Sequence, residues 1–407
     1  MAQFRILSLD GGGSWALIQI KALINLFSPN GTGTDVNGHQ VLRKFDLVIG
    51  NSGGTITLGG LLMDKPLAEI LGYFENADLR GQIFATASVF RDPASFVTEK
   101  SLGVGYKYNT QAKLAGLKSI MGPLSESPVS AVPAMLGPNY RGSKTNVVFC
   151  AFDYDRNRET FFRSDLASLS GASRLDVSIV LAIHTSSNAP VNYFDAPAET
   201  PVGRYWDGAI GGYNNPVFAG VVEALANATV NGTSRAEICA LSLGTGSVVL
   251  PLQRHIPHEN PILVSPAANW NLPNDIKKLA ASIIDDPPDA ASFHAHIVLG
   301  GPLPPSPVAP ATSGRIMRMS PLVQPFLGDA EVPWMLPPRI SAADFQALVN
   351  LDSDATAQAD VDRISAFADQ WIAGEILNQP IQADPLTLVP RVGHRFYAEA
   401  KQAWSAL

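Results

Sequence analysis

Short hydrophobic runs alternate with glycine-rich turns along the first part of the chain. Residues 4–9 form an apolar run that ends at three glycines, and residues 15–27 then carry apolar side chains at helical spacing. The order of strand, glycine turn and helix returns at residues 45–49, 50–54 and 56–63. This alternation predicts an α/β fold with a mostly parallel central sheet, because strands separated by helices pair in parallel, and with helices covering both faces.

The rest of the chain continues the pattern. Residues 147–152 and 159–162 flank a polar turn, which predicts a β-hairpin. The other elements that we expect are a helix over 177–183, a strand over 204–206, a helix that begins at Asn215-Pro216, a strand over 238–243, and helices over 360–377 and 394–404. Proline-rich segments at 303–310 and 332–338 predict surface connectors.

The domain organisation follows from where the alternation weakens. Residues 1–300 are interpreted as one α/β domain, in which the aromatic-rich stretch 64–140 forms a cap or a helical insertion. The aromatic-rich segment after Asp64 is also a candidate lid, and deletion of residues 89–103 is the test of that interpretation. Residues 301–407 hold the proline-rich connectors and the C-terminal helices, and we expect this helical and loop extension to pack on the same domain.

Composition disfavours several classes of protein. Of 407 residues, 46% are hydrophobic and 16% are charged, against about 25% charged in typical soluble chains, which argues against disorder. The net charge of −7 disfavours nucleic-acid binding and gives no attraction to an anionic membrane, so contact with lipid would rest on apolar surface. No secretory signal or transmembrane run is visible, which predicts a cytoplasmic protein or one exported without a signal.

The two cysteines, Cys150 and Cys239, each lie in an apolar run that predicts a buried strand. Two thiols cannot form a disulfide framework, and alone they cannot form a zinc site. We therefore interpret both as packed core residues. No other pattern in the sequence indicates a metal or a cofactor.

The first candidate for chemistry is Ser52, in the pentapeptide Gly50-Asn51-Ser52-Gly53-Gly54. This fits G-x-S-x-G, in which glycines let neighbouring backbone pass close to a serine on a tight strand-to-helix turn. Such a turn exposes the hydroxyl at a helix N-terminus, whose dipole favours developing negative charge. The alternative is a glycine-rich turn with an ordinary capping serine.

The second candidate is Asp10-Gly11-Gly12-Gly13, directly after the first apolar run. Successive glycines can turn several N–H groups toward one concavity that holds an anion. A nucleotide phosphate loop fits poorly, because no Gly-Lys-Ser/Thr follows and Ala16 takes the place of the last glycine in G-x-G-x-x-G. Two interpretations remain, an oxyanion hole for acyl transfer and a tight turn without chemistry.

A serine nucleophile needs a base, and the residues leave two kinds open. The first is Asp207, in Asp207-Gly208-Ala209 after a short strand, where burial beside the serine would raise its pKa above about 3.9. The second is a histidine of a Ser-His-Asp triad. The histidines that follow Asp207 in the chain are not flanked by a recognisable site pattern: His255, His258, His294, His296 and His394. His39 lies in a polar loop, and His184 ends a predicted helix, where we expect it to pack or cap.

Together these motifs resemble those of patatin-like phospholipases. The stretch from Ser8 to Gly13, the pentapeptide around Ser52 and the tripeptide Asp207-Gly208-Ala209 are similar to the family's three motifs and stand in the family's order. The connecting segments that are also similar are 185–194, 214–216 and 241–246. The resemblance covers about residues 4–246, with weaker similarity around 315–321.

The resemblance implies a lipid acyl hydrolase of the phospholipase A type with a Ser–Asp dyad and neither metal nor cofactor. Ser52 would attack an ester carbonyl of a phospholipid or related lipid, Asp207 would take its proton, and water would hydrolyse the acyl-enzyme. The N–H groups of Gly11, Gly12 and Gly13 would hold the oxyanion. The partners would be a lipid substrate and, transiently, a membrane or micelle surface.

The chain departs from the family directly after the three glycines. The family continues with a variable residue, a basic residue and a glycine, where this chain has Ser14, Trp15 and Ala16. The basic side chain that could contact a phosphate headgroup is therefore absent from this position. Two alternatives stay open beside the Ser–Asp hydrolase: a Ser-His-Asp esterase, and a non-catalytic member that binds lipid or a partner.

Overall fold

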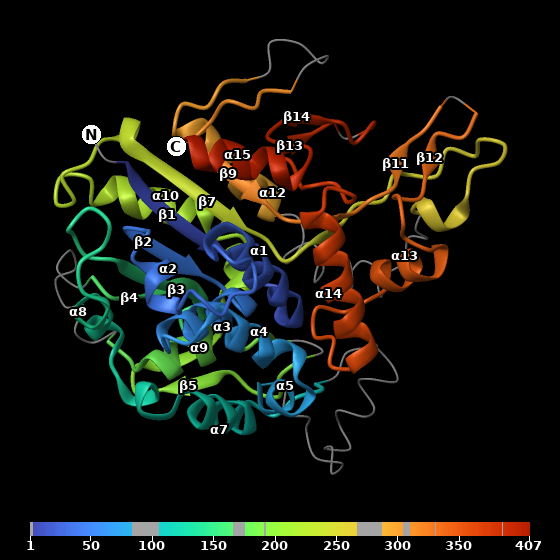
Figure 1. Cartoon of the computed structure of the whole chain (residues 1–407). Helices are drawn as coiled ribbons and strands as arrows, with labels where there is room; N and C mark the ends of the chain where they lie inside the picture. The colour runs from blue at the N-terminus through green and yellow to red at the C-terminus, as the bar shows by residue number, and fades with distance from the viewer. Residues whose placement is uncertain are drawn as a thin grey trace.

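A central sheet organises the computed structural model, which describes residues 3–83, 106–165, 176–190, 193–266, 287–303, 310–329, 331–384 and 386–407 (Figure 1). Within these residues eight strands form one sheet in the order β5-β6-β3-β2-β1-β7-β9, with β4 also paired to β3. The strands are β1 (Phe4–Leu9), β2 (Leu47–Gly50), β3 (Asn146–Asp153), β4 (Arg158–Arg163), β5 (Ala198–Thr200), β6 (Gly203–Asp207), β7 (Ile238–Leu243) and β9 (Ile316–Met319).

The centre of the sheet is parallel. Strands β1, β2, β3, β7 and β9 run in one direction, whereas β4 and β6 are antiparallel to β3. Every residue of β2 and β7 is buried, which explains why these strands are continuous apolar runs in the sequence. The predicted hairpin is confirmed as β3 and β4, and both cysteines are free and buried, in β3 and β7.

Helices cover both faces of the sheet, as predicted. Outward-facing residues of the sheet pack in two separate clusters, one against α10 and α12 and the other against a larger set of helices that includes α1, α3 and α9. The helices are α1 (Leu17–Phe27), α2 (Gly38–Leu42), α3 (Gly53–Leu62), α4 (Leu67–Glu75), α5 (Ala77–Ile83), α7 (Thr110–Met121), α8 (Val132–Leu136), α9 (Ile179–Ser186), α10 (Val217–Ala226), α12 (Pro287–Val298), α13 (Ala342–Val349), α14 (Gln358–Ile372) and α15 (Tyr397–Ala406).

The C-terminal helices share the larger core. Phe367 and Trp371 of α14 and Trp404 of α15 belong to the same buried cluster as α1, and Trp15 meets Phe367 edge to face with 6.4 Å between ring centroids. Figure 1 shows α14 beside α1. Helix α14 ends at Ile372, five residues before the predicted end, and Gly374 follows with a left-handed φ of 84°.

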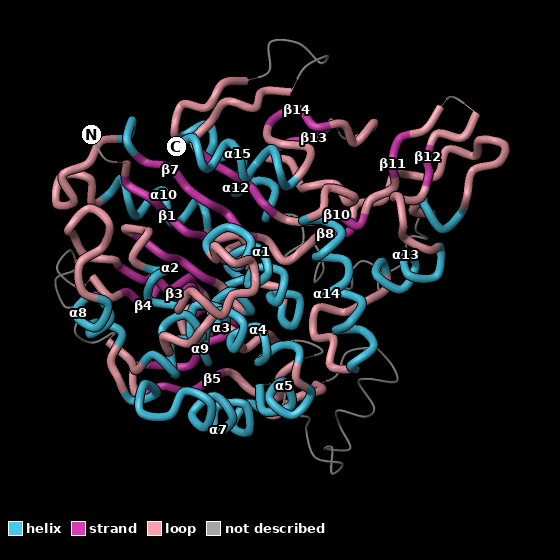
Figure 2. The backbone as a smooth tube through the Cα atoms, in the orientation of Figure 1, coloured by secondary structure: helices cyan, strands magenta, loops and turns pink. Residues whose placement is uncertain are grey.

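The segment 332–338, predicted as a connector, contains a short strand. Strand β12 (Trp334–Met335) pairs antiparallel with β11 (Phe326–Leu327), and Figure 2 shows this hairpin projecting from the body of the molecule. Of the predicted cap, the described part forms α4, α5, α7 and α8, while the predicted lid at 89–103 lies outside the described residues.

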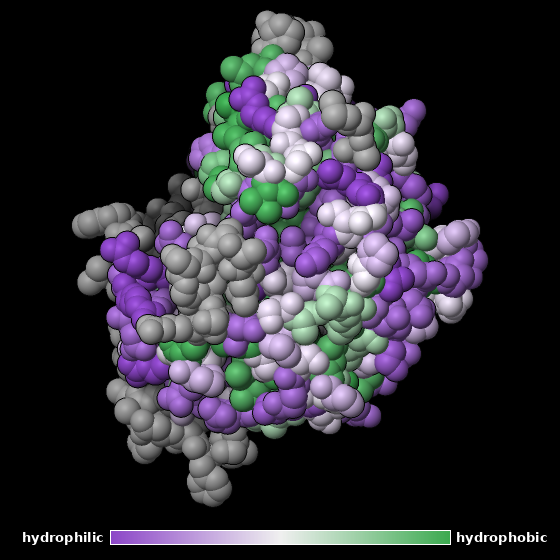
Figure 3. All heavy atoms as spheres, turned by 90° about the vertical axis from the view of Figure 1, so that its left-hand side faces the viewer, coloured by the Kyte–Doolittle hydropathy of each residue, from purple (hydrophilic) through white to green (hydrophobic). Residues whose placement is uncertain are grey.

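The hydrophobicity of the surface and of the helices determines how the protein could contact lipid. On the face in Figure 3, hydrophobic side chains lie in separate patches among hydrophilic ones. None of the helices in the described ranges combines the length and the hydrophobicity that a membrane span requires.

Candidate active site

The register of three strands brings Ser52 and Asp207 to the same level of the sheet. Gly50, at the end of β2, pairs with Phe149 in the parallel direction, and Ser52 follows two residues later. Asp207, at the end of the antiparallel β6, pairs with Ala151, two residues beyond Phe149. Strand β3 therefore lies between the two side chains and sets their common height.

Ser52 occupies a strained turn between β2 and α3. Its φ of 49° and ψ of −122° lie in a region that non-glycine residues rarely adopt, and Ser52 is the N-cap of α3. The turn is tight because a Cβ at Gly54 would lie 2.2 Å from the carbonyl oxygen of Leu9. Gly53 begins the helix, so its dipole points at the serine with its positive end.

Asp207 is buried and hydrogen-bonded on several sides. Only 2% of the residue is exposed, and its Oδ1 accepts hydrogen bonds from Asn51 Nδ2 and from the Ala209 N–H, each at 2.9 Å. Gly208 leaves room for this contact, since a Cβ there would lie 2.4 Å from Asn51 Oδ1. The carboxylate of Asp207 is thereby held in one orientation.

Burial and several polar neighbours set the charge state of Asp207. Burial raises the pKa of the Asp207 carboxyl above its ordinary value. The neighbouring Ser52, the Ala209 N–H and Asn51 lower it, as does the charge of Lys113. The net result is a raised pKa. A buried carboxylate that lines one cavity with a serine can act as the base that takes the proton of that serine.

The glycine loop passes beside the serine. The N–H of Gly11, which the sequence suggested as an oxyanion donor, donates to the Asn214 carbonyl at 2.8 Å and is therefore occupied. Gly12 and Gly13 have φ values of 149° and 55° and are partly exposed. Among the described residues, neither of their N–H groups donates to another protein group. The loop therefore offers two open N–H groups rather than three.

Two adjoining cavities meet at this loop. A cavity of about 60 Å³ is lined by Ser52, Asp207, Gly12 and Gly13 among others. A larger cavity of about 420 Å³ shares Gly12 with it, together with Tyr193, Asn214 and Ser353. The shared residues make the large cavity a continuation of the small one.

Several residues of the site were not found by sequence reasoning. Asn51 had a local signal, since it stands inside the pentapeptide next to Ser52. Lys113, which is 1% exposed and donates to the His184 carbonyl at 3.2 Å, had none. The same holds for Ser353, whose carbonyl accepts the Ser14 N–H at 2.9 Å and whose hydroxyl meets the Tyr193 hydroxyl at 3.0 Å.

The histidines lie elsewhere. None of the seven, all of which fall in described ranges, lines the cavity that contains Ser52. His184 is fully buried in α9, and burial holds its pKa well below the ordinary value. His255 and His258 are exposed, and His296 contacts the Pro302 carbonyl at 2.9 Å. The described geometry therefore places an aspartate, and no histidine, at the serine.

Comparison with known proteins identifies the family of this chain. The family description "patatin-like phospholipase" matches residues 7–220, which is more than half of the 407 residues. The chain belongs to the patatin-like phospholipase family. Membership of this family supports a lipid acyl hydrolase activity in general terms. A search of curated proteins found no match.

Three solved structures show a distant likeness. The crystal structure of VipD from Legionella pneumophila is 12% identical with a TM-score of 0.35, and the match covers 99% of this chain and 74% of that one. Full-length ExoU from Pseudomonas aeruginosa, in complex with full-length SpcU, is 11% identical with a TM-score of 0.27, covering 74% and 53%. A second structure of the type III effector ExoU is 12% identical with a TM-score of 0.26, and the match covers 74% of this chain and 54% of that one.

Proposed function

We propose that this protein is a serine hydrolase of the phospholipase A type, which cleaves fatty-acyl ester bonds of phospholipids or related lipids. One observation carries the proposal: Ser52 and the buried Asp207 line the same small cavity as Gly12 and Gly13, and the neighbouring Ser52 lowers the pKa of the Asp207 carboxyl. The nucleophile, its base and two open N–H groups are thus in one place. This is the set of groups that acyl transfer requires.

The first half of the reaction acylates the enzyme. Ser52 Oγ attacks the ester carbonyl carbon as its proton passes to Asp207, and the carbonyl oxygen becomes an oxyanion. The N–H groups of Gly12 and Gly13 stabilise that charge, with help from the N-terminus of α3. The tetrahedral intermediate then collapses, the C–O bond to the alcohol breaks, and the leaving alkoxide takes the proton from Asp207.

The second half releases the fatty acid. Water gives its proton to Asp207 as its oxygen attacks the acyl carbon, a second oxyanion forms in the same place, and Ser52 leaves with the returned proton. Burial raises the pKa of Asp207, which brings a carboxylate closer to the range of an effective base. The cycle needs no metal or cofactor, and its lipid would come from a membrane or micelle surface.

The proposal extends to the arrangement of the chain. Residues 1–300 would form the catalytic domain, 301–407 its packed extension, and part of 64–140 a cap over the substrate. Asp10, Gly50, Gly53 and Ala209 would be the motif residues that support this site.

Labelling and hydrolysis test the proposal together. Wild type should react with a fluorophosphonate probe and release fatty acid from defined phospholipid vesicles, whereas Ser52→Ala and Asp207→Asn should lose at least about 10³-fold in hydrolysis. Ser8→Ala is a matched control, because Ser8 is a fully buried serine on β1 that does not line the cavity. It should remain active.

Three outcomes would count against the proposal. Full activity of Ser52→Ala would exclude Ser52 as the nucleophile. Loss of activity in an alanine variant of His255, His258, His294, His296 or His394, with the fold intact, would favour a triad. A wild-type protein that binds vesicles but neither reacts with the probe nor releases fatty acid would be a non-catalytic member of the family.

A further inference from the structure

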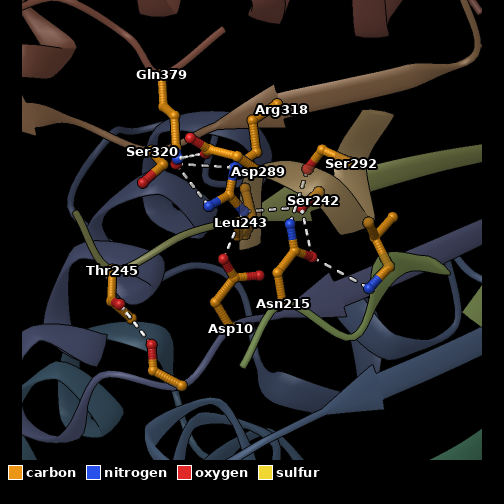
Figure 4. Close-up of polar contacts among 12 residues, drawn as sticks. Asp10, Asn215, Ser242, Leu243, Thr245, Asp289, Ser292, Arg318, Ser320 and Gln379 are labelled. Atoms are coloured by element: carbon orange, nitrogen blue, oxygen red, sulfur yellow. Dashed lines mark hydrogen bonds and ion pairs between the residues drawn. The ribbon is translucent and has the colours of Figure 1, made fainter. Parts of the chain in front are cut away.

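A buried ion pair lies next to the glycine loop (Figure 4). Asp10, the residue before Gly11, is 2% exposed, and Arg318 of β9 is 3% exposed. Their nearest atoms, Asp10 Oδ2 and Arg318 Nη1, are 2.5 Å apart. Arg318 lies outside the residues 7–220 that match the family description.

We propose that Arg318 is a positioning residue for hydrolysis: by holding the carboxylate of Asp10, it fixes the direction in which the Gly12 and Gly13 N–H groups point. This inference rests on the proposed function, because it concerns the oxyanion donors of that reaction. Arg318 itself touches neither the nucleophile nor the cavity that contains it.

Strand register explains how Arg318 reaches the loop. In the sheet, Ser8 of β1 pairs with Ser242 of β7, and Ser242 pairs with Arg318 of β9. The arginine side chain crosses β7 on its way to Asp10, and its Nη1 also donates to Ser242 Oγ at 2.9 Å. The side chain of Arg318, on the edge strand β9, thus reaches Asp10 at the end of the central strand β1.

The guanidinium has little freedom to turn. Its Nε and Nη2 both donate to Gln379 Oε1, at 3.1 and 2.7 Å, while Nη1 serves Asp10 and Ser242. Gln379 is itself held, because its amide nitrogen donates to Asp289. Figure 4 shows Asp10, Arg318, Gln379 and Asp289 in one continuous network. The planar guanidinium of Arg318 is therefore held in one orientation toward the carboxylate of Asp10.

The ion pair adds a charged contact to a loop whose glycines carry no side chains. The Asp10 N–H donates to the Leu243 carbonyl at 3.0 Å, and the Gly11 carbonyl accepts from Thr245 Oγ1 at 2.6 Å. On the other side of Gly12 and Gly13, the Ser14 N–H donates to the Ser353 carbonyl at 2.9 Å. Ser14, Trp15 and Ala16 bring no positive charge, and the Trp15 indole donates to the Asp352 carbonyl. The charge for Asp10 comes from β9.

The ion pair also responds to pH. The pKa of Asp10 is raised to about 7, because the effect of burial, with a smaller contribution from the charge of Asp289, exceeds the lowering by Arg318. Protonation of Asp10 removes its charge and weakens its attraction to Arg318. Loss of Arg318 would raise the pKa further, so that Asp10 would be neutral at physiological pH. Removing the arginine thus removes both charges of the pair.

The test compares four variants with wild type: Arg318→Met, Arg318→Lys, Asp10→Asn and Arg318→Met with Asp10→Asn. The kcat and KM for a soluble ester are measured beside thermal unfolding. Arg318→Met should lower kcat by about 10- to 100-fold and change KM by less than about 2-fold, because a donor that is misdirected but present costs less than the ~10²–10³ of a missing one. Arg318→Lys should lose less, since it keeps the charge.

Two further readouts separate positioning from stability alone. The double variant should match Arg318→Met within about 3-fold, because residues that act as a unit are not additive. Asp10→Asn should remove any step near pH 7 from the rate profile. Arg315→Met is the control: Arg315 precedes β9 and donates to the Arg235 and Leu299 carbonyls, so its loss should leave kcat unchanged.

The inference is overturned if Arg318→Met unfolds at a lower temperature but keeps the wild-type kcat per folded molecule. If Arg318→Met does not fold, the test rests on Arg318→Lys and Asp10→Asn. The inference is also overturned if both of these variants keep the wild-type kcat and the wild-type pH profile. An active Ser52→Ala would instead refute the proposed function. Inactive Ser52→Ala together with fully active Arg318 variants would refute only the role of Arg318.

Discussion

Asn51 is one of the groups that lower the pKa of the proposed base, and its contribution can be measured. Its Nδ2 donates to Asp207 Oδ1 at 2.9 Å, and the two residues are 0% and 2% exposed. A hydrogen bond to a charged group is worth about 1.5–3 kcal/mol, and 1.36 kcal/mol corresponds to about one pKa unit. Asn51→Leu, which keeps the size of the side chain but not the donor, should therefore raise the pKa of Asp207 by roughly 1–2 further.

The sign of the effect follows from the role of a base. Asp207 accepts a proton only when ionised, so activity falls as the pH falls through its pKa. In Asn51→Leu the acid limb of the kcat/KM profile should move upward by about 1–2 pH units, with the rate above it largely kept. A carboxyl whose pKa is raised in the folded state favours folding at low pH, where it is protonated. This contribution to the free energy of unfolding is lost as the pH rises through the raised pKa. The variant should therefore be destabilised most at high pH.

The measurement is a pH profile of ester hydrolysis from about pH 4 to about pH 9. Asn139→Leu is a matched control, because Asn139 is 7% exposed and its Nδ2 donates to Asp46 Oδ1 at 3.0 Å, away from the cavity that contains Ser52. It should change stability without moving the acid limb. An active Asn51→Leu with an unmoved limb would refute Asp207 as the titrating base, or the contact with Asn51 as its regulator.

Three further results are expected. Ser52→Gly should abolish hydrolysis yet raise the free energy of unfolding by about 1 kcal/mol in denaturant titrations, since it relieves the positive φ of 49°; a destabilised variant would contradict the strain. Gly11→Ala should lose activity, because the new Cβ would lie 2.9 Å from Ser52 Cβ. Gly72→Ala on α4 is the control: no atom lies within 4 Å of its Cβ, and its free energy of unfolding should rise by about 0.5–1 kcal/mol. Trp371→Ala should cost about 3–5 kcal/mol in one calorimetric transition, and two transitions would contradict a shared core.

Local sequence determined the elements and the order of the motifs. The apolar runs that became β1, β2 and β7 are buried along almost their whole length, so each reads as a strand without reference to distant residues. Ser52 was identified because a G-x-S-x-G turn needs glycines for steric reasons. The structure shows this reason at Gly54, where a Cβ would lie 2.2 Å from the Leu9 carbonyl oxygen. Helix ends were less well predicted, since α14 ends at Ile372.

The contacts between distant segments were decided only by the tertiary structure. Ser52 and Asp207 meet because β2 runs parallel and β6 antiparallel to the same strand, a register that neither local sequence specifies. The Gly11 N–H is occupied by Asn214, and Asp10 is paired with Arg318, 308 positions away along the chain. Such pairs arise from strand order, and strand order depends on the packing of the whole core.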